Sequence, residues 1–181
     1  ETLRRLGRLP LLTELVIAGS TAEDGLAALA GAPSIERLDT EARSNADLAI
    51  LAHMAKLREL ALSVGSWVGA DGLKTLATSK TIEEISYSTD GRAVGIGELA
   101  EMPRLTHLKL VYQAVPAAEL ARLARAPRLA TLDLREADVT DEGLVVLAKS
   151  RSLKHLGLWH VSVSPKVRRL LARSMEVDTG D

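Results

Sequence analysis

Hydrophobic residues recur along this chain in the pattern L-x-x-L-x-L, and the pattern returns at a nearly constant interval. The first residues of successive copies lie 22 to 25 positions apart. A period of this length is typical of a solenoid, in which each repeat stacks on the next. The seven copies are Leu12/Leu15/Ile17, Ile35/Leu38/Thr40, Leu57/Leu60/Leu62, Ile82/Ile85/Tyr87, Leu105/Leu108/Leu110, Leu129/Leu132/Leu134 and Leu153/Leu156/Leu158.

Each copy alternates apolar and polar positions, as a half-buried strand does. In segment 131–135, Leu132 and Leu134 alternate with Thr131, Asp133 and Arg135. Successive side chains of a strand point to opposite faces, so the leucines would face inward and the polar residues outward. The pattern therefore predicts one strand in each repeat.

A second pattern follows each predicted strand and has the period of a helix. Thr140 stands where a helix N-cap is expected, and Leu144, Leu147 and Ala148 then form a single apolar stripe. We predict a short helix in each repeat, and the corresponding segments are 25–30, 47–52, 72–77, 97–102, 119–124, 143–148 and 167–172.

A strand and a short helix within 22–25 residues exclude the all-helical repeats, which need about 33–47 residues. The expected fold is an α/β solenoid of seven repeats with a parallel sheet on its concave face and helices outside. We expect a single domain over residues 1–181. Residues 1–9 would be the second half of a repeat, and the tail of residues 175–181 the unstructured start of another repeat.

The repeats resemble the leucine-rich repeat family over essentially the whole chain. They look most similar to the short bacterial GALA-type and ribonuclease-inhibitor-like variants, whose helices contain D-x-G-L-x-x-L-A. Segment 141–148 matches this stretch and Asp71-Gly72-Leu73 matches it in part. The resemblance implies a horseshoe-shaped solenoid and, by analogy alone, a bacterial effector that recruits a host protein. The asparagine usual after the last strand leucine is replaced by Ser20, Arg43, Gly65, Asp90, Gln113, Ala137 and Val161.

Composition limits the classes of function. The chain has no cysteine, which excludes disulfides and thiolate metal sites. Its net charge of −1 predicts no bulk attraction to nucleic acid or to a membrane surface. No apolar run approaches the ~20 residues that span a bilayer. The cations of segment 166–173 are interpreted as a solvated helix face, and the alternative is binding to an acidic surface or to nucleic acid. We therefore expect a cytoplasmic protein that binds neither nucleic acid nor membrane.

The outward positions of the predicted strands form a polar surface whose charge changes along the chain. Residues 10–102 contain 14 acidic and 7 basic residues, whereas residues 103–181 contain 9 acidic and 13 basic ones. Such polarity would orient a partner of complementary charge. The alternative is a solvated face with unevenly distributed charges. The candidate partner-binding positions are Glu59, Glu84, His107, Lys109, Asp133, Arg135, His155 and Trp159.

Trp159 and Arg135 occupy equivalent outward positions of adjacent predicted strands. Tryptophan and arginine are enriched where interfaces concentrate their binding energy, so an exposed Trp159 would contact a partner. The alternative is a tryptophan that is stacked on Arg135 in a cation–π contact or covered by the C-terminal helix. The sequence leaves both interpretations open.

No arrangement of side chains predicts catalysis, a metal site or a cofactor site. His107 and His155 share a column two strands apart, roughly 9–10 Å, with only Thr131 between them, which does not suit zinc. The outward serines lack a histidine oriented by a carboxylate. Lys109 is expected to form a surface ion pair with Asp133 of the next strand.

These observations predict a non-catalytic protein that binds a protein or peptide on its sheet. Seven strands about 4.8 Å apart give a surface roughly 29 Å long, which suits such a partner better than a small molecule. The competing hypothesis is a scaffold or assembly module of a larger protein that uses its ends or its convex helices. The oligomeric state does not follow from the sequence.

Overall fold

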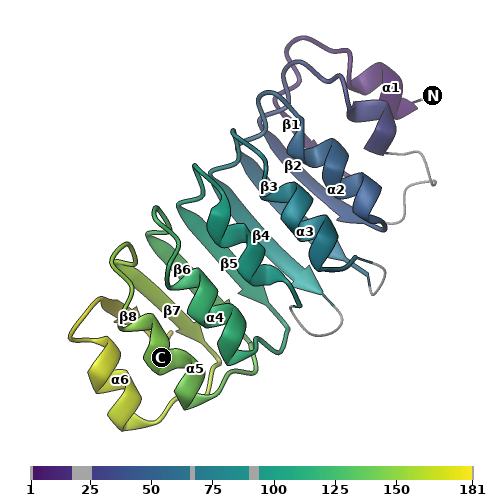
Figure 1. Cartoon of the computed structure of the whole chain (residues 1–181). Coiled ribbons are helices and arrows are strands. Elements are labelled where there is room, and N and C mark those ends of the chain that lie inside the picture. Colours follow the sequence, from purple (N-terminus) through teal and green to yellow (C-terminus); the bar gives the residue numbers. More distant parts are fainter. Residues whose placement is uncertain (1, 18–25, 66–67, 90–93, 181) are drawn as a thin grey trace.

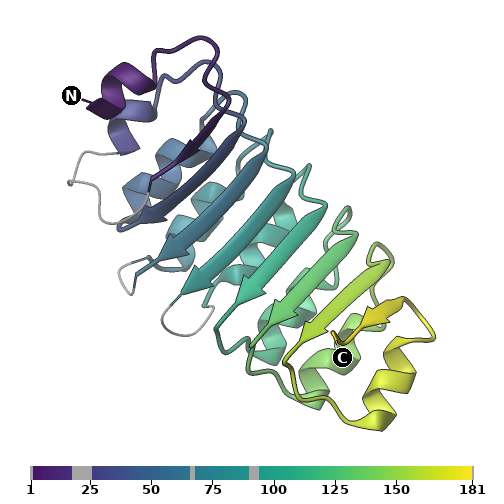
Figure 2. The same cartoon turned by 180° about the vertical axis from the view of Figure 1, so that it is seen from behind.

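The computed structural model describes residues 2–17, 26–65, 68–89 and 94–180, which form an elongated stack of strand–helix units (Figure 1). The described strands make one eight-stranded sheet, in which each strand pairs in parallel with the next strand of the chain. The sheet forms one face of the molecule and the helices cover the other (Figures 1 and 2). The predicted α/β repeat solenoid is confirmed.

The strands follow the L-x-x-L-x-L pattern, and the inward leucine of each copy stands beside that of the next copy. Leu108 of the fifth strand pairs with Leu132 of the sixth, and Leu132 pairs with Leu156 of the seventh. The strands are β1 (Glu14–Val16), β2 (Arg37–Ala42), β3 (Glu59–Val64), β4 (Glu84–Thr89), β5 (His107–Val111), β6 (Thr131–Arg135), β7 (His155–Trp159) and β8 (Glu176–Asp178).

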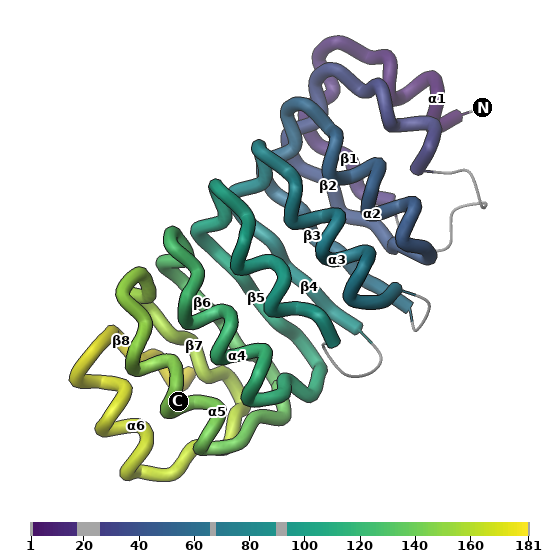
Figure 3. Tube along the Cα trace, viewed as in Figure 1, coloured from purple at the N-terminus to yellow at the C-terminus, as the bar shows by residue number. Residues whose placement is uncertain are grey.

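The helical segments return the chain to the sheet once in each repeat, as the Cα trace in Figure 3 shows. Thr140 caps the helix of the clearest repeat by accepting from the N–H of Gly143, as the sequence predicts. Two of the expected helices are tighter 3₁₀ helices, labelled η. The elements are α1 (Thr2–Leu6), η1 (Leu26–Leu29), α2 (Asn45–Ala52), α3 (Ala70–Leu76), η2 (Ile96–Glu101), α4 (Ala117–Leu123), α5 (Asp141–Leu147) and α6 (Pro165–Leu171).

The core is a thin layer of aliphatic side chains between the sheet and the helices. Leu132, Leu134, Leu144 and Leu147 are completely buried in one repeat. Tyr87 takes the place of the third strand leucine and is also buried, and this burial raises the pKa of its hydroxyl to about 12. In the described part of the chain, no helix is long and apolar enough to cross a membrane.

The two ends of the stack differ from the sequence-based expectation. The tail does start another repeat, but the prediction that it is unstructured is wrong for Glu176–Asp178, because this segment forms β8 on the edge of β7. Met175 is buried beside it and extends the apolar layer. At the opposite end, Leu15 is only half-buried, because β1 is the first strand of the described sheet and has a neighbour on one side only.

Side chains at the helix starts connect neighbouring repeats. Glu119 of α4 accepts hydrogen bonds from the backbone N–H groups of Gly95 (3.1 Å) and Gly97 (2.7 Å), which lie at the start of η2. Asn45 of α2 accepts from the N–H of Gly69 (3.3 Å) before α3. These contacts satisfy N–H groups that have no partner within their own helix, so they join the repeats at the ends of the helices.

The buried residue Gln113 stands at a position where leucine-rich repeats usually have asparagine. Gln113 is 3% exposed, and its side-chain amide donates to the backbone carbonyl of Tyr87 in the preceding repeat (3.2 Å). The side-chain oxygen of the same amide, Oε1, is buried without a hydrogen-bond partner. A single glutamine therefore makes, at this one turn, a side-chain bond to the neighbouring repeat.

Candidate functional site

The outward side chains of β1–β8, which we call the sheet face, stand in columns because the strands pair in register. Neighbouring strands are about 4.8 Å apart, so side chains of adjacent strands in one column are within reach of each other. The first column consists of Glu14, Arg37, Glu59, Glu84, His107, Thr131, His155 and Glu176.

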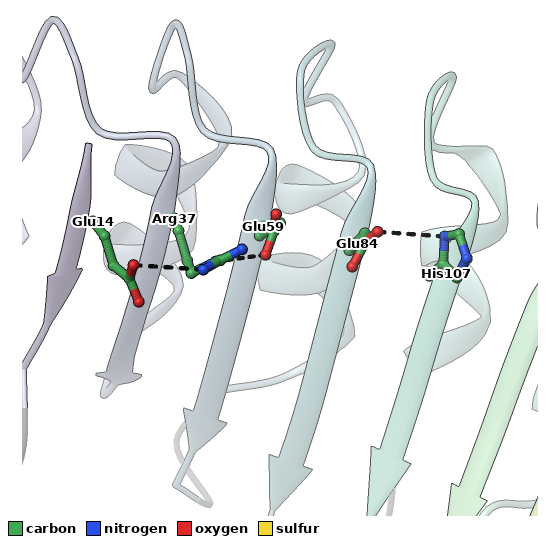
Figure 4. Close-up of polar contacts among 5 residues, drawn as sticks. All are labelled: Glu14, Arg37, Glu59, Glu84 and His107. Carbon is green, nitrogen blue, oxygen red and sulfur yellow. Dashed lines mark hydrogen bonds and ion pairs between the residues drawn. The ribbon is translucent and has the colours of Figure 1, made fainter.

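Arg37 joins the acidic residues on either side of it in this column. Its Nε donates to Glu59 (2.6 Å), and its Nη1 lies 3.4 Å from Glu14 (Figure 4). The hydrogen bond from Arg37 lowers the pKa of the Glu59 carboxyl below its ordinary value, and the same bond raises the pKa of Arg37. The side chains of Arg37 and Glu59 are 53% and 41% exposed, so the pair orders the surface more than it stabilises the fold.

Two like charges meet in the middle of the column, where Glu59 stands directly beside Glu84. The two carboxylates turn away from each other in Figure 4: Glu59 faces Arg37, whereas Glu84 faces His107, whose Nδ1 is 3.7 Å away. Like charges on adjacent strands repel each other. Glu59 thus pairs with Arg37 and Glu84 stands beside His107, so the two carboxylates have their neighbours on opposite sides.

A hollow of about 270 Å³ opens in the sheet face at this place. Its middle is formed by the small side chains of Ala61 and Ser86, which stand side by side in the second column. This column consists of Val16, Asp39, Ala61, Ser86, Lys109, Asp133, Gly157 and Asp178. Five of the predicted partner-binding residues line the hollow together with Arg37: Glu59, Glu84, His107, Lys109 and Asp133. The structure thus brings together most of the predicted residues, around the centre of the sheet face.

The ion pair predicted between Lys109 and Asp133 is not formed. The two residues are register partners on β5 and β6, as expected, and both line the hollow. Among the described residues, however, no ion pair within 4.0 Å includes either side chain. Lys109 and Asp133, both half-buried, therefore border the hollow without an ion-pair partner within 4.0 Å in the described chain.

Trp159 and Arg135 lie apart from the hollow and contact each other. The guanidinium carbon of Arg135 is 5.0 Å from the centre of the indole ring, which is the cation–π contact considered above. The indole Nε1 and the Arg135 Nε are buried without a hydrogen-bond partner. Of the two interpretations of Trp159, the structure therefore contains the stacked one.

Two glycines make room for the indole of Trp159. A Cβ at Gly157 would collide with Asp133 Oδ1 and come within 2.7 Å of the indole Nε1, and a Cβ at Gly180 would collide with the ring. Gly180, which follows β8, thus covers part of the tryptophan. Half-buried and covered on two sides, Trp159 offers less surface to a partner than the sequence suggests.

His155 belongs to the end of the first column, where it lies 2.9 Å from Glu176 of β8. The side chains of both residues are more than half exposed. Within the described ranges, no group of three or more histidine, aspartate or glutamate residues is arranged to hold a metal ion.

Arg37, Ala61 and Ser86 are the outward-facing hollow residues that we did not select from the sequence; the inward residues Leu60, Ile85 and Leu108 also line it. Arg37 sets the orientation of Glu59, while Ala61 and Ser86 provide the space. A signal for them was present: the second column has two consecutive small residues between the charged Asp39 and Lys109. Small side chains on adjacent strands of a polar face predict a depression.

Comparisons with known proteins give a fold likeness only. No protein-family model matches the chain, and no curated protein sequence matches it. A solved structure of an internalin C2 from Listeria monocytogenes is similar, with a TM-score of 0.49 and 16% sequence identity over 92% of this chain and 78% of that chain. The fold described above follows from the strand pairing of the chain itself and does not depend on this likeness.

Proposed function

We propose that this protein is a non-catalytic recognition module that binds a protein or peptide partner on the sheet face. The observation that supports this proposal is the central hollow, which is bordered by the unpaired charges of Lys109 and Asp133. The sheet face spans eight strands and therefore offers room for many further contacts around the hollow. The hollow would receive one side chain of the partner, as interface pockets receive anchor residues.

The charges around the hollow favour a cationic anchor. Glu59 and Glu84 stand side by side with no cation between them, and with Asp133 the lining has three carboxylates against the two cations Arg37 and Lys109. Each acid of the first pair has a cationic or titratable neighbour only on its far side. A lysine or arginine of the partner that enters between them would meet complementary charge at short range.

Replacement of Ser86 by arginine tests the proposal, because the new side chain would fill the hollow and meet Glu84. We expect S86R to remain folded, and we expect its affinity for the captured partners to fall by more than about tenfold. The measurement is a pull-down from cell extract, quantified by mass spectrometry, followed by titration of the main captured protein. Ser162→Arg adds the same charge at an exposed loop position outside the hollow and is the matched control. Capture by S86R equal to that by the wild type and the control would contradict the proposal.

A scaffold function is the second candidate, and exposed apolar residues at the N-terminal end favour it. Leu11 is 90% exposed, Val16 is 61% exposed and Leu9 is 47% exposed, and they lie in or near β1, which has a strand neighbour on one side only in the described sheet. If the end of the stack makes the main contact, Leu11→Glu would abolish capture in the same pull-down and S86R would not. The two candidates therefore predict opposite results for the two variants.

A further inference from the structure

Basic residues are concentrated on the turns that lead from the helices into the last three strands. The turns are segments 124–130, 148–154 and 172–175, which we call the basic edge. They belong to the row of turns at the upper left of the molecule in Figure 3. These three segments contain no acidic residue. Their cations, all exposed, are Arg125, Arg128, Lys149, Arg151, Lys154 and Arg173.

The cations of the basic edge have no ionic partners among the described residues. Every ion pair of the described chain lies elsewhere. The nearest pair along this row of turns joins Arg104, in the turn before β5, to Glu83, in the turn before β4 (2.7 Å). The net charge of −1 for the whole chain conceals this local concentration, because most of the acids lie in residues 10–102. Six unpaired cations on three consecutive turns produce a positive potential along one long side of the molecule.

Two depressions lie on either side of the turn that contains Arg125 and Arg128. One depression, of about 440 Å³, is lined by Arg125, Lys149 and Arg151. The other, of about 520 Å³, is lined by Lys80 and Arg128 and by the Arg104–Glu83 pair. Each depression thus collects cations from different turns, so that several of them reach one anionic group or two neighbouring ones.

We propose that the basic edge binds the phosphate backbone of a double-stranded nucleic acid, without regard to base sequence. Arginine and lysine that neutralise consecutive phosphates supply sequence-independent binding of this kind. The surface is separate from the hollow of the sheet face, so the inference goes beyond the recognition function proposed above. A protein with both surfaces holds its sheet-face partner next to nucleic acid.

The basic edge has no exposed large apolar or aromatic residue, and this favours a double-stranded nucleic acid over an acidic protein or a single strand as its partner. The exposed large apolar residues of the described chain are Leu9, Leu11, Val16, Val94, Tyr112 and Leu170, and none lies in the three turns. Protein interfaces rely on apolar or aromatic anchors at their centre, and single strands are bound by stacking of bases on aromatic rings. A surface of cations without either suits a duplex backbone.

The inference is tested by fluorescence anisotropy with a labelled DNA duplex of mixed sequence, about 20 base pairs long. We expect the wild type to bind at about 50 mM salt, with log K falling against log salt at a slope of about −3 to −5. Combined replacement of Arg125, Lys149 and Arg151 by alanine should reduce the slope by about three and weaken binding more than about tenfold. These side chains are exposed and unpaired, so the variant should keep the circular dichroism spectrum of the wild type.

The control removes three exposed cations from the helix layer: Lys74, Lys166 and Arg169. This variant should bind the duplex as the wild type does, and S86R should also bind it, which separates this inference from the proposed function. Absence of wild-type binding at low salt would overturn the inference. Equal losses in the two triple variants would overturn it too, and so would equally tight binding of labelled polyglutamate.

Discussion

Replacement of Leu132 by alanine is expected to lower the free energy of unfolding by about 2–5 kcal/mol. Leu132 is completely buried in the middle of β6, between Leu108 and Leu156 of the adjacent strands. Its removal leaves a cavity in an apolar layer that is only one strand and one helix thick, where few neighbours are able to move in. The measurement is urea unfolding followed by circular dichroism, with the m-value compared between variants.

The matched control for Leu132 is its neighbour in the same strand. Thr131 points to the sheet face and is half-exposed, so Thr131→Ala should change the free energy of unfolding by less than about 1 kcal/mol. Similar losses in the two variants would mean that the inward and outward positions of β6 are wrongly assigned.

Replacement of Gly95 by alanine is expected to cost about 2–4 kcal/mol, for two independent reasons. Gly95 has a φ of 82°, a left-handed conformation that residues with a Cβ rarely adopt. An added Cβ would also lie 2.5 Å from the Cα of Ala70 in the preceding repeat, and this contact is with backbone, which is unable to rotate away. The start of η2 would then shift, and with it the bonds from Gly95 and Gly97 to Glu119.

Gly31 is the control for Gly95. It lies in a turn, has no positive φ, and an added Cβ there would meet no atom within 4 Å. Gly31→Ala should therefore leave the urea midpoint unchanged or raise it slightly, because alanine restricts the unfolded chain. A similar loss in both variants would show that the close approach of Gly95 to Ala70 does not limit the stacking of these repeats.

The fold was predictable because two periodic patterns agree. The inward positions of the strands and the apolar stripe of the helices repeat with the same interval, and only a strand–helix solenoid satisfies both. The identity of each column of the sheet face followed directly, since pairing in register puts equivalent positions side by side. Tyr87, which replaces a leucine in the pattern, is buried as the pattern predicts.

The hollow was less predictable, because it depends on how side chains orient within a column. Register places Glu59 beside Glu84, but their separation results from the choice of Arg37 and His107 as partners. The expected pairing of Lys109 with Asp133 failed for a related reason: proximity in register does not ensure that two exposed charges meet.

The sequence pattern also predicted neither the left-handed turn residues nor the local concentration of positive charge. Tyr112, Glu136 and His160 adopt left-handed conformations at equivalent turns, although none is glycine, and nothing in their spacing indicates this. The basic edge was hidden because its cations are scattered in the sequence and only stacking of the turns brings them into one row.

Cysteine scanning of β5 tests most directly the claim that this chain exposes one face of a stacked parallel sheet. The chain has no cysteine, so each variant would carry a single thiol. Cysteines in place of His107, Lys109 and Val111 should react rapidly with a thiol reagent, whereas those in place of Leu108 and Leu110 should react only after unfolding. Equally fast reaction at all five positions would contradict the alternation from which both the sheet face and its hollow follow.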